Sequence, residues 1–224
     1  EDLKERMKPH MIPDEYGQST ICNIYFDTPT FLLVRRSLEK PVYKEKLRVR
    51  SYGTASFDSQ VFVELKKKYE SVVYKRRMGL TNGQAMDWLC RGKRPGQLGQ
   101  IGREIQYVLD FYEEVRPMMY LSYEREAYFG KEDPNFRVTF DEEIRWRTKQ
   151  ISLEKGVFGT PLLSSDQVLM EVKTPFAVPL WMSGWLSRHQ VYRTSFSKYG
   201  LAYQQMTEAR GWSGNPARGI TKAS

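Results

Sequence analysis

Residues 43–52 read Tyr43-Lys44-Glu45-Lys46-Leu47-Arg48-Val49-Arg50-Ser51-Tyr52. Side chains alternate between the two faces of a β-strand, so Lys44, Lys46, Arg48 and Arg50 would share one face. The opposite face is apolar towards its middle, at Leu47 and Val49. Cations in a row along one strand repel each other unless an anion lies against them. The segment therefore predicts a strand with one face in the core and the other against an anionic ligand, such as a row of phosphates.

The same alternation recurs in later segments. Residues 60–69 place Val61, Val63 and Leu65 on one face, and Glu64, Lys66 and Lys68 on the other. Residues 117–129, 136–141 and 167–173 follow the same rule, with faces that carry Tyr123 and Arg125, Arg137 and Asp141, and Glu171 and Lys173. A short strand around residues 72–78 adds Lys75, and residues 20–27 form another strand. A solvated face would explain one such strand, but the recurrence favours a shared ligand-binding surface.

Helices are expected between the strands. They are predicted at residues 1–11 (the end of a helix), 28–38, 81–91, 100–115, 179–188 and 198–206, with Thr28 as an N-cap. This order predicts an α+β fold with an antiparallel sheet. If the apolar strand faces pack under helices, the charged faces line a hydrophilic tunnel in an antiparallel β-barrel with helices outside. Residues 1–210 would form this single domain, followed by a disordered tail over residues 211–224.

The composition favours an anionic partner. The 224 residues carry a net charge of +8, which suits nucleic acid, an anionic membrane surface or a phosphorylated small molecule. The sequence has no RNA-binding motif and no set of base-stacking aromatic residues on one strand face, which disfavours nucleic acid. No apolar run approaches the about 18 residues of a transmembrane helix. Cys22 and Cys90 lie in different expected elements and do not suggest a disulfide framework, so a cytoplasmic location is expected.

The charged strand faces mix cations with a few carboxylates. Arginine forks bind phosphate oxygens in a bidentate manner, and lysine contributes a point charge. Glu64, Asp141 and Glu171 offer oxygen ligands to a hard divalent cation that bridges phosphates. For Glu64 and Asp141 a salt bridge across the sheet is an equally physical role. The whole set suits a complex of a metal ion with a polyphosphate.

Several segments resemble a known family in order along the chain. They are Tyr25-Phe26-Asp27-Thr28, Lys46-Leu47-Arg48-Val49-Arg50-Ser51-Tyr52, Phe62-Val63-Glu64-Leu65-Lys66, Tyr123-Glu124-Arg125-Glu126-Ala127, Arg137-Val138-Thr139-Phe140-Asp141, Met170-Glu171-Val172-Lys173 and Ser197-Lys198-Tyr199. Together they resemble the catalytic domain of the VTC (vacuolar transporter chaperone) family, a branch of the CYTH-like triphosphate tunnel metalloenzymes. The resemblance implies a β-tunnel enzyme that transfers the γ-phosphate of ATP onto a growing inorganic polyphosphate chain with Mn²⁺ or Mg²⁺.

The resemblance also implies roles for individual residues. The phosphate-binding cations would be Arg48, Arg50, Lys66, Lys75, Arg125 and Arg137, with Tyr123 donating to a phosphate oxygen, Glu171 ligating the metal, and Ser197 and Lys198 binding phosphate near one tunnel mouth. Lys46 and Lys173 lie on the same charged faces and join the substrate-binding set. Phosphoryl transfer needs positioning and charge neutralisation more than a general base, which fits a chain whose only histidines are His10 and His189.

The sequence departs from the family pattern in places. Tunnel metalloenzymes contribute an early strand, and this chain begins after its place, so the tunnel is expected to lack one wall. Ser195 stands where some relatives have a basic residue. Lys67, Arg76 and Arg77 are expected at the surface at least as much as at the ligand.

Two alternatives to a polymerase remain. One is a tunnel hydrolase of tripolyphosphate or nucleoside triphosphates, which would release orthophosphate. The other is a non-catalytic module that binds polyphosphate, inositol phosphates or RNA, with a steep salt dependence and no need for a metal.

Overall fold

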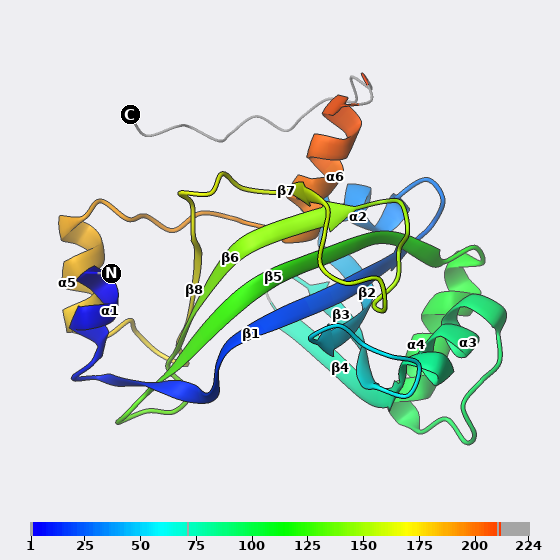
Figure 1. Ribbon diagram of the computed structural model, residues 1–224, viewed down its shortest axis with the longest axis horizontal. Helices are drawn as coiled ribbons and strands as arrows, with labels where there is room; N and C mark the ends of the chain where they lie inside the picture. The colour runs from blue at the N-terminus through cyan, green and yellow to red at the C-terminus, as the bar shows by residue number, and fades with distance from the viewer. Residues whose placement is uncertain (1, 71, 210, 212–224) are drawn as a thin grey trace.

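The computed structural model of the protein describes residues 2–70, 72–209 and 211. Its strands are β1 (Met11–Asp27), β2 (Tyr43–Tyr52), β3 (Gln60–Tyr69), β4 (Val72–Thr81), β5 (Arg116–Gly130), β6 (Arg137–Arg147), β7 (Thr160–Pro161) and β8 (Leu169–Lys173). Its helices are α1 (Asp2–Met7), α2 (Leu32–Leu38), α3 (Asn82–Arg91), α4 (Gln100–Tyr112), α5 (Leu180–Arg188) and α6 (Lys198–Ala209) (Figure 1). The predicted tail over 211–224 lies, apart from Gly211, outside the described residues.

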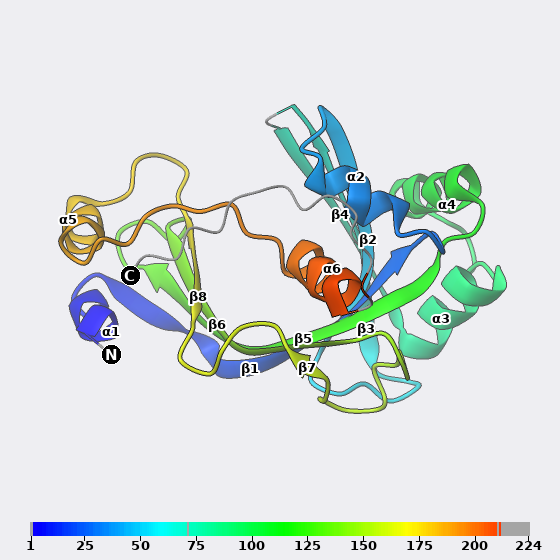
Figure 2. The same ribbon diagram turned by 90° about the horizontal axis from the view of Figure 1, so that it is seen from above.

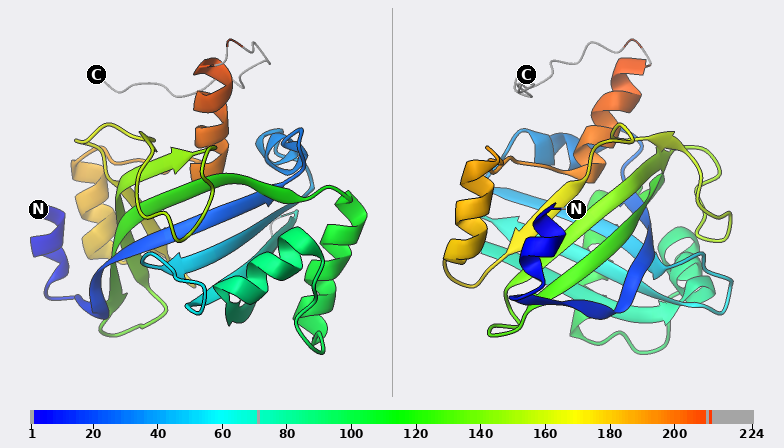
Figure 3. Two further views of the ribbon diagram at one scale, coloured as in Figure 1. Left: turned by 45° about the vertical axis from the view of Figure 1, so that its right-hand side comes forward. Right: turned by 60° about the vertical axis from the view of Figure 1, so that its left-hand side comes forward.

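All strands belong to one antiparallel sheet of eight strands, in the order β4-β3-β2-β1-β5-β6-β7, with β8 also paired to β6. This confirms the predicted α+β class. The sheet curls into a trough: β2, β3 and β4 form one wall, β8 forms the other, and β1, β5 and β6 form the floor (Figures 2 and 3). Within the described residues β4 and β8 do not pair with each other, so the curled barrel is open on that side.

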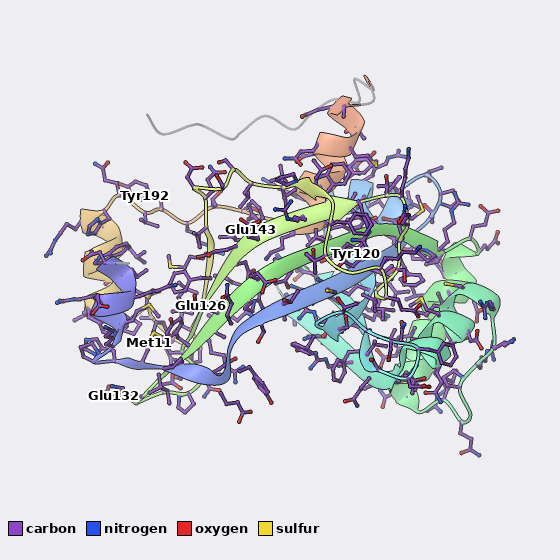
Figure 4. All side chains as sticks on the ribbon, in the orientation of Figure 1. Met11, Tyr120, Glu126, Glu132, Glu143 and Tyr192 are labelled. Carbon is purple, nitrogen blue, oxygen red and sulfur yellow. The ribbon has the colours of Figure 1, made fainter. Side chains whose placement is uncertain are left out.

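Two apolar clusters hold helices against the outer face of the trough. Leu47, Val49 and Val63 pack with Trp88 of α3 and Ile105 of α4. At the other end, residues that include Met11, Val138 and Phe140 pack with α1 and α5 (Figure 4). The apolar faces of these strands therefore pack under helices, as the alternation in the sequence predicts.

Helix α6 differs from this arrangement, because it packs on the inner face. Its residues Tyr199 and Ala202 lie against Ile21, Tyr25 and Leu121 of β1 and β5. Figure 2 shows α6 between the two walls of the trough. The inner face is thus divided into an apolar end, which α6 covers, and a charged end.

Some boundaries differ from the sequence-based expectation. Strand β1 begins at Met11 rather than at residue 20, and its first residues pair with the end of β5. Helix α2 begins at Leu32 rather than directly after Thr28. Asp27 accepts the N–H groups of Leu33 and Val34, and Thr28 Oγ1 accepts that of Leu32, so two side chains from the end of β1 satisfy the start of the helix. The short strand β7 was not anticipated.

Candidate functional site

A buried glutamate gathers cations from the wall strands. Glu64 lies opposite Arg48 of β2 and opposite Arg77 of β4 in the sheet register. Arg48 Nη2 is 2.6 Å from Glu64 Oε2, while Lys75 Nζ and Arg77 Nε are each 3.0 Å from Oε1. The Glu64 side chain is only 2% exposed. Burial acts to raise its pKa, but the charges of Arg48, Arg50 and Lys75 lower the pKa to about 2.

A second buried carboxylate holds cations from the floor and from α6. Arg125 donates through Nε and Nη2 to the two oxygens of Asp141 at 2.6 and 2.8 Å, a bidentate pair. Lys198 Nζ donates to Asp141 Oδ2. Asp141 is fully buried, and although burial opposes the charged form, the bonds and charges of Arg125 and Lys198 lower its pKa. The first residue of α6 is thereby tied to β6.

Neutral side chains also orient the guanidinium groups of Arg50 and Arg48. Arg50 donates to Asn23 Oδ1 at 3.0 Å and to the Tyr123 hydroxyl at 3.2 Å. Arg48 Nη1 donates to the Tyr25 hydroxyl at 3.2 Å. Because a hydroxyl can accept and donate at the same time, Tyr123 accepts from Arg50 and still has its own proton to donate. Tyr25 was not expected in the site from the sequence, and only the register of β1 with β2 places it there.

Lysines extend the charged face beyond the arginines. Lys46 Nζ donates to Ser197 Oγ at 2.9 Å, just before α6, and burial with the charges of Lys44 and Lys66 lowers its pKa to about 8. Lys66 lies opposite Lys46 in the register. Burial and the charge of Arg48 lower the pKa of Lys66, while the charge of Glu171 acts in the other direction. Glu171 is therefore within electrostatic reach of the opposite wall.

The three predicted metal ligands do not meet in one place. Among the residues that the structure describes, no group of three or more His, Cys, Asp or Glu side chains is placed to hold a metal ion. Glu64 and Asp141 are each held by several cations. Glu171 has a side chain 46% exposed, and among the described residues its one ion pair is with Lys173, at 3.4 Å. Since Mg²⁺ is commonly bound through one or two carboxylates plus substrate phosphates, Glu171 alone fits such an ion.

Two further arginines, Arg137 and Arg77, differ in their surroundings. Arg137 is exposed, and its guanidinium contacts the Pro134 carbonyl and the Phe129 ring rather than another candidate residue. Arg77 lies on Glu64 and over the Phe62 ring, which favours the ligand-side alternative of the two that the sequence left open for it. The missed signal was the two-residue period of β4, which places Arg77 on the same face as Lys75.

Arg76 and Lys67, the other two cations for which a surface role was considered, lie on the outer face of the sheet. Arg76 points to the outer face, where its Nε is 3.1 Å from Glu104 of α4. Lys67 lies opposite Glu45 in the register, and Glu45 accepts hydrogen bonds on the outer face from Tyr43 and Tyr112.

Acid should destabilise the protein through Glu64. Because its pKa is lowered in the folded state, the carboxylate contributes stability above its ordinary pKa, and this contribution is lost as the pH falls from about 4.5 towards 2. We expect the melting temperature of the wild type to drop over this range. Glu64→Gln should melt lower than the wild type at pH 7 and show a shallower dependence on pH. Thermal denaturation of the wild type and of Glu64→Gln across this pH range measures the effect, with Glu143→Gln as the matched control on an exposed glutamate. If the melting temperatures of the wild type and of Glu64→Gln fall equally with pH, Glu64 is not the group whose protonation destabilises the fold.

The sequence matches a known family, and the fold matches solved structures. The VTC domain profile matches residues 1–207. No curated protein matches the sequence. Among solved structures, a Hippeastrum protein assigned as an adenylyl cyclase and found to have a dominant triphosphatase activity superposes with a TM-score of 0.52 at 16% identity, over 91% of this chain and 88% of that chain.

Two bacterial proteins assigned as adenylate cyclases superpose less well. The one from Bacillus halodurans has a TM-score of 0.45 at 13% identity, over 92% of this chain and 82% of its own. The one from Vibrio parahaemolyticus has a TM-score of 0.45 at 10% identity, over 90% of each chain. No described helix has the length and apolar character needed to cross a membrane. The domain match covers nearly the whole chain and confirms the resemblance found in the sequence: the protein belongs to the VTC domain family.

Proposed function

We propose that the protein is a metal-dependent polyphosphate polymerase that uses ATP. The observation that carries this proposal is the set of guanidinium groups on one concave face, where Arg48 and Arg125 are fixed by the buried carboxylates Glu64 and Asp141. These arginines are the ones that the VTC resemblance assigns to phosphate. Donors that are already oriented can stabilise the charge of a phosphoryl group without reorganising during the reaction.

The reaction would be an in-line transfer. An oxygen of the terminal phosphate of the chain attacks the γ-phosphorus of ATP and forms a new P–O–P link. The bond from that phosphorus to the β,γ-bridging oxygen breaks, and its electron pair leaves with ADP. The attacking phosphate is already anionic, so the protein needs no general base. Arg48, Arg50 and Arg125 would bind the transferred phosphoryl group, and Lys66 and Lys198 would add positive charge.

The family implies a divalent cation, Mn²⁺ or Mg²⁺, and Glu171 is the residue that would hold it. The ion would neutralise charge on the phosphates when bound. Glu64 and Asp141 would act on the reaction indirectly, because their oxygens are taken up by cations of the protein.

A tunnel hydrolase is the second candidate. The exposed side chain of Glu171 and the open side between β4 and β8 leave room for water to reach the phosphates. The Hippeastrum relative in fold is described by its triphosphatase activity. Water in place of the chain terminus would release orthophosphate with the same cations in the same roles.

One incubation separates these functions. The protein is supplied with ATP and Mn²⁺, the anionic products are resolved on a gel, and ADP and orthophosphate are followed separately. ADP with a ladder of long chains supports the polymerase. ADP with an equal amount of orthophosphate supports the hydrolase. Binding of polyphosphate without turnover supports the non-catalytic module.

Glu171→Gln should weaken the dependence on metal specifically. The amide keeps the shape of the side chain but removes the charge that a hard cation needs, so we expect the Mn²⁺ concentration for half-maximal activity to rise at least about tenfold. Glu143→Gln is the matched control, because Glu143 is an exposed glutamate on β6 that pairs with Arg145 (Figure 4). A Mn²⁺ titration of both variants tests the role, and an unchanged midpoint in Glu171→Gln removes this residue as a ligand.

A further inference from the structure

Four lysines form two facing pairs on the inner side of the wall. Lys44 of β2 lies opposite Lys68 of β3, and Lys46 lies opposite Lys66. We call these four residues the lysine ladder. Like charges directly opposite each other destabilise a sheet, so the fold carries this arrangement at a cost. A row of cations that repel one another is the arrangement that a long anion would relieve.

The ladder has no local counter-charge. Within the described residues, none of its four ammonium groups has a carboxylate oxygen within 4.0 Å. Lys44 donates to the Ser37 carbonyl and Lys46 to the Ser197 hydroxyl, and both of these acceptors are neutral. Burial together with the charges of Lys68 and Lys66 lowers the pKa of Lys44. The charge of Glu171 acts in the opposite direction on Lys66.

Between Lys46 and Arg48, the inward-facing cations of β2 change from having no carboxylate partner to having one. Arg48 is the next inward residue after Lys46, and it lies opposite Glu64, which also pairs with Lys75 and Arg77. On the arginine side of this step, cations are held by buried carboxylates. On the lysine side they are not. A compact triphosphate needs the fixed arginines and extends at most to the inner pair, Lys46 and Lys66, whereas the outer pair, Lys44 and Lys68, adds nothing for a ligand that ends there.

The ladder leads away from the arginines towards the free end of the wall. Alternate residues of a strand are about 7 Å apart, so Lys44 lies about 13 Å along the strand from Arg48. Figure 2 shows this end of β2, β3 and β4 projecting past α2. The tyrosines at this end, Tyr43 and Tyr69, have the opposite parity and are exposed on the other face. Neither of these two rings therefore lies beside the ladder lysines to stack a base.

We propose that the lysine ladder binds the polyphosphate chain where it leaves the reaction centre, from the inner pair Lys46 and Lys66 out to the pair Lys44 and Lys68, and guides it along β2 and β3 past α2. This inference rests on the proposed function and deepens it, because it names the path of the polymer. The ligand is a linear inorganic polyphosphate longer than three units. Every unit carries negative charge, so the chain matches regularly spaced cations without any base or sugar recognition.

The test compares two ligands on one double variant. Lys44→Ala/Lys68→Ala removes the pair furthest from the arginines and leaves every residue of the proposed reaction centre in place. We expect its affinity for long-chain polyphosphate to fall at least about tenfold at fixed salt, and the slope of log K against log salt to decrease by about one to two. The affinity for tripolyphosphate should change less than about twofold. The control is Lys67→Ala/Lys155→Ala, which removes the same charge from the outer face and an exposed loop and should leave both affinities unchanged.

Several outcomes would overturn the proposal. The ladder is not a polymer site if both ligands lose affinity equally, if neither does, or if the control loses as much as the ladder variant. RNA of similar charge that binds the wild type as tightly and needs the same lysines would make the ladder a nucleic-acid site instead. The melting temperature of Lys44→Ala/Lys68→Ala shows whether the variant is folded. Because the change removes two repelling charges, the variant should be at least as stable as the wild type.

The binding assay also separates this inference from the proposed function. If the wild type makes no polymer but the contrast between long and short ligands holds, the polymerase fails and the ladder stands. If the double variant makes polymer of unchanged length and binds it with unchanged affinity, the ladder fails and the polymerase stands.

Discussion

Arg48→Ala should lower the turnover of ATP by about 100- to 1,000-fold, the usual effect of removing one oriented donor from a site that stabilises developing charge. Two donors of Arg48 are directed at Glu64 Oε2 and one at the Tyr25 hydroxyl. A guanidinium has five N–H groups, so two remain free for a phosphoryl oxygen. The arginine is thus held on one edge and available on the other.

The fold should survive this change. After Arg48 is removed, Lys75 and Arg77 still lie 3.0 Å from Glu64 Oε1, so the buried carboxylate keeps two partners. We expect a modest loss of melting temperature with a large loss of kcat/KM for ADP formation. Thermal denaturation and initial rates on the same preparation measure the two effects separately.

Two further variants define what Arg48 supplies. Arg48→Lys keeps the charge but loses the planar fork, so it should lie between the wild type and Arg48→Ala if geometry matters. Arg76→Ala removes an arginine from the outer face of β4, two strands away in the sheet, and should leave the rate unchanged. A near-normal rate for Arg48→Ala would contradict the assignment of this face to phosphate.

The faces of the strands could be predicted from sequence because the two-residue period leaves only two choices for each side chain. Once the apolar residues Leu47 and Val63 are placed in the core, Arg48 and Glu64 must point to the other side. The period does not reveal which strands lie next to each other. The pairing of Glu64 with Arg48 and Arg77 depends on register, and so does the approach of Tyr25 to Arg48.

The remaining differences also have physical causes. In β4, Lys75, Arg76 and Arg77 are consecutive cations, and a run of like residues hides the alternation. The first part of β1 contains Pro13 and Gly17, which ordinarily mark a turn, and its pairing with β5 shifts register there. The apolar stripe of α6 predicts burial but not the side of the sheet, which is why its position on the inner face was not foreseen.

Asp141→Ala should destabilise the protein by about 3–5 kcal/mol, the usual cost of breaking a buried ion pair on one side. Asp141 is completely buried, and the side chains of Arg125 and Lys198 are 19% and 13% exposed, so neither cation can be fully hydrated where it lies. The loss should also loosen the start of α6, which Lys198 ties to β6. Urea denaturation at pH 7 measures the change in the free energy of unfolding.

The pH dependence and a second-site variant check this cause. The lowered pKa of Asp141 means that its contribution is present at neutral pH and is lost as the pH falls through the folded-state pKa, so Asp141→Ala should lose less stability in acid than the wild type. Asp141→Ala/Arg125→Ala should recover part of the loss, because the unpaired guanidinium is gone.

Tripolyphosphate provides the last comparison. In the wild type, Asp141 supplies the anion that keeps Arg125 and Lys198 together before substrate arrives. In Asp141→Ala a bound phosphate would replace the anion that these two cations have lost, so tripolyphosphate should raise the melting temperature of the variant by more degrees than that of the wild type. A smaller shift in the variant would mean that Asp141 holds the cations in the geometry that phosphate needs. A loss of less than about 1 kcal/mol in Asp141→Ala would instead show that Arg125 and Lys198 are well hydrated without it, as in an exposed ion pair.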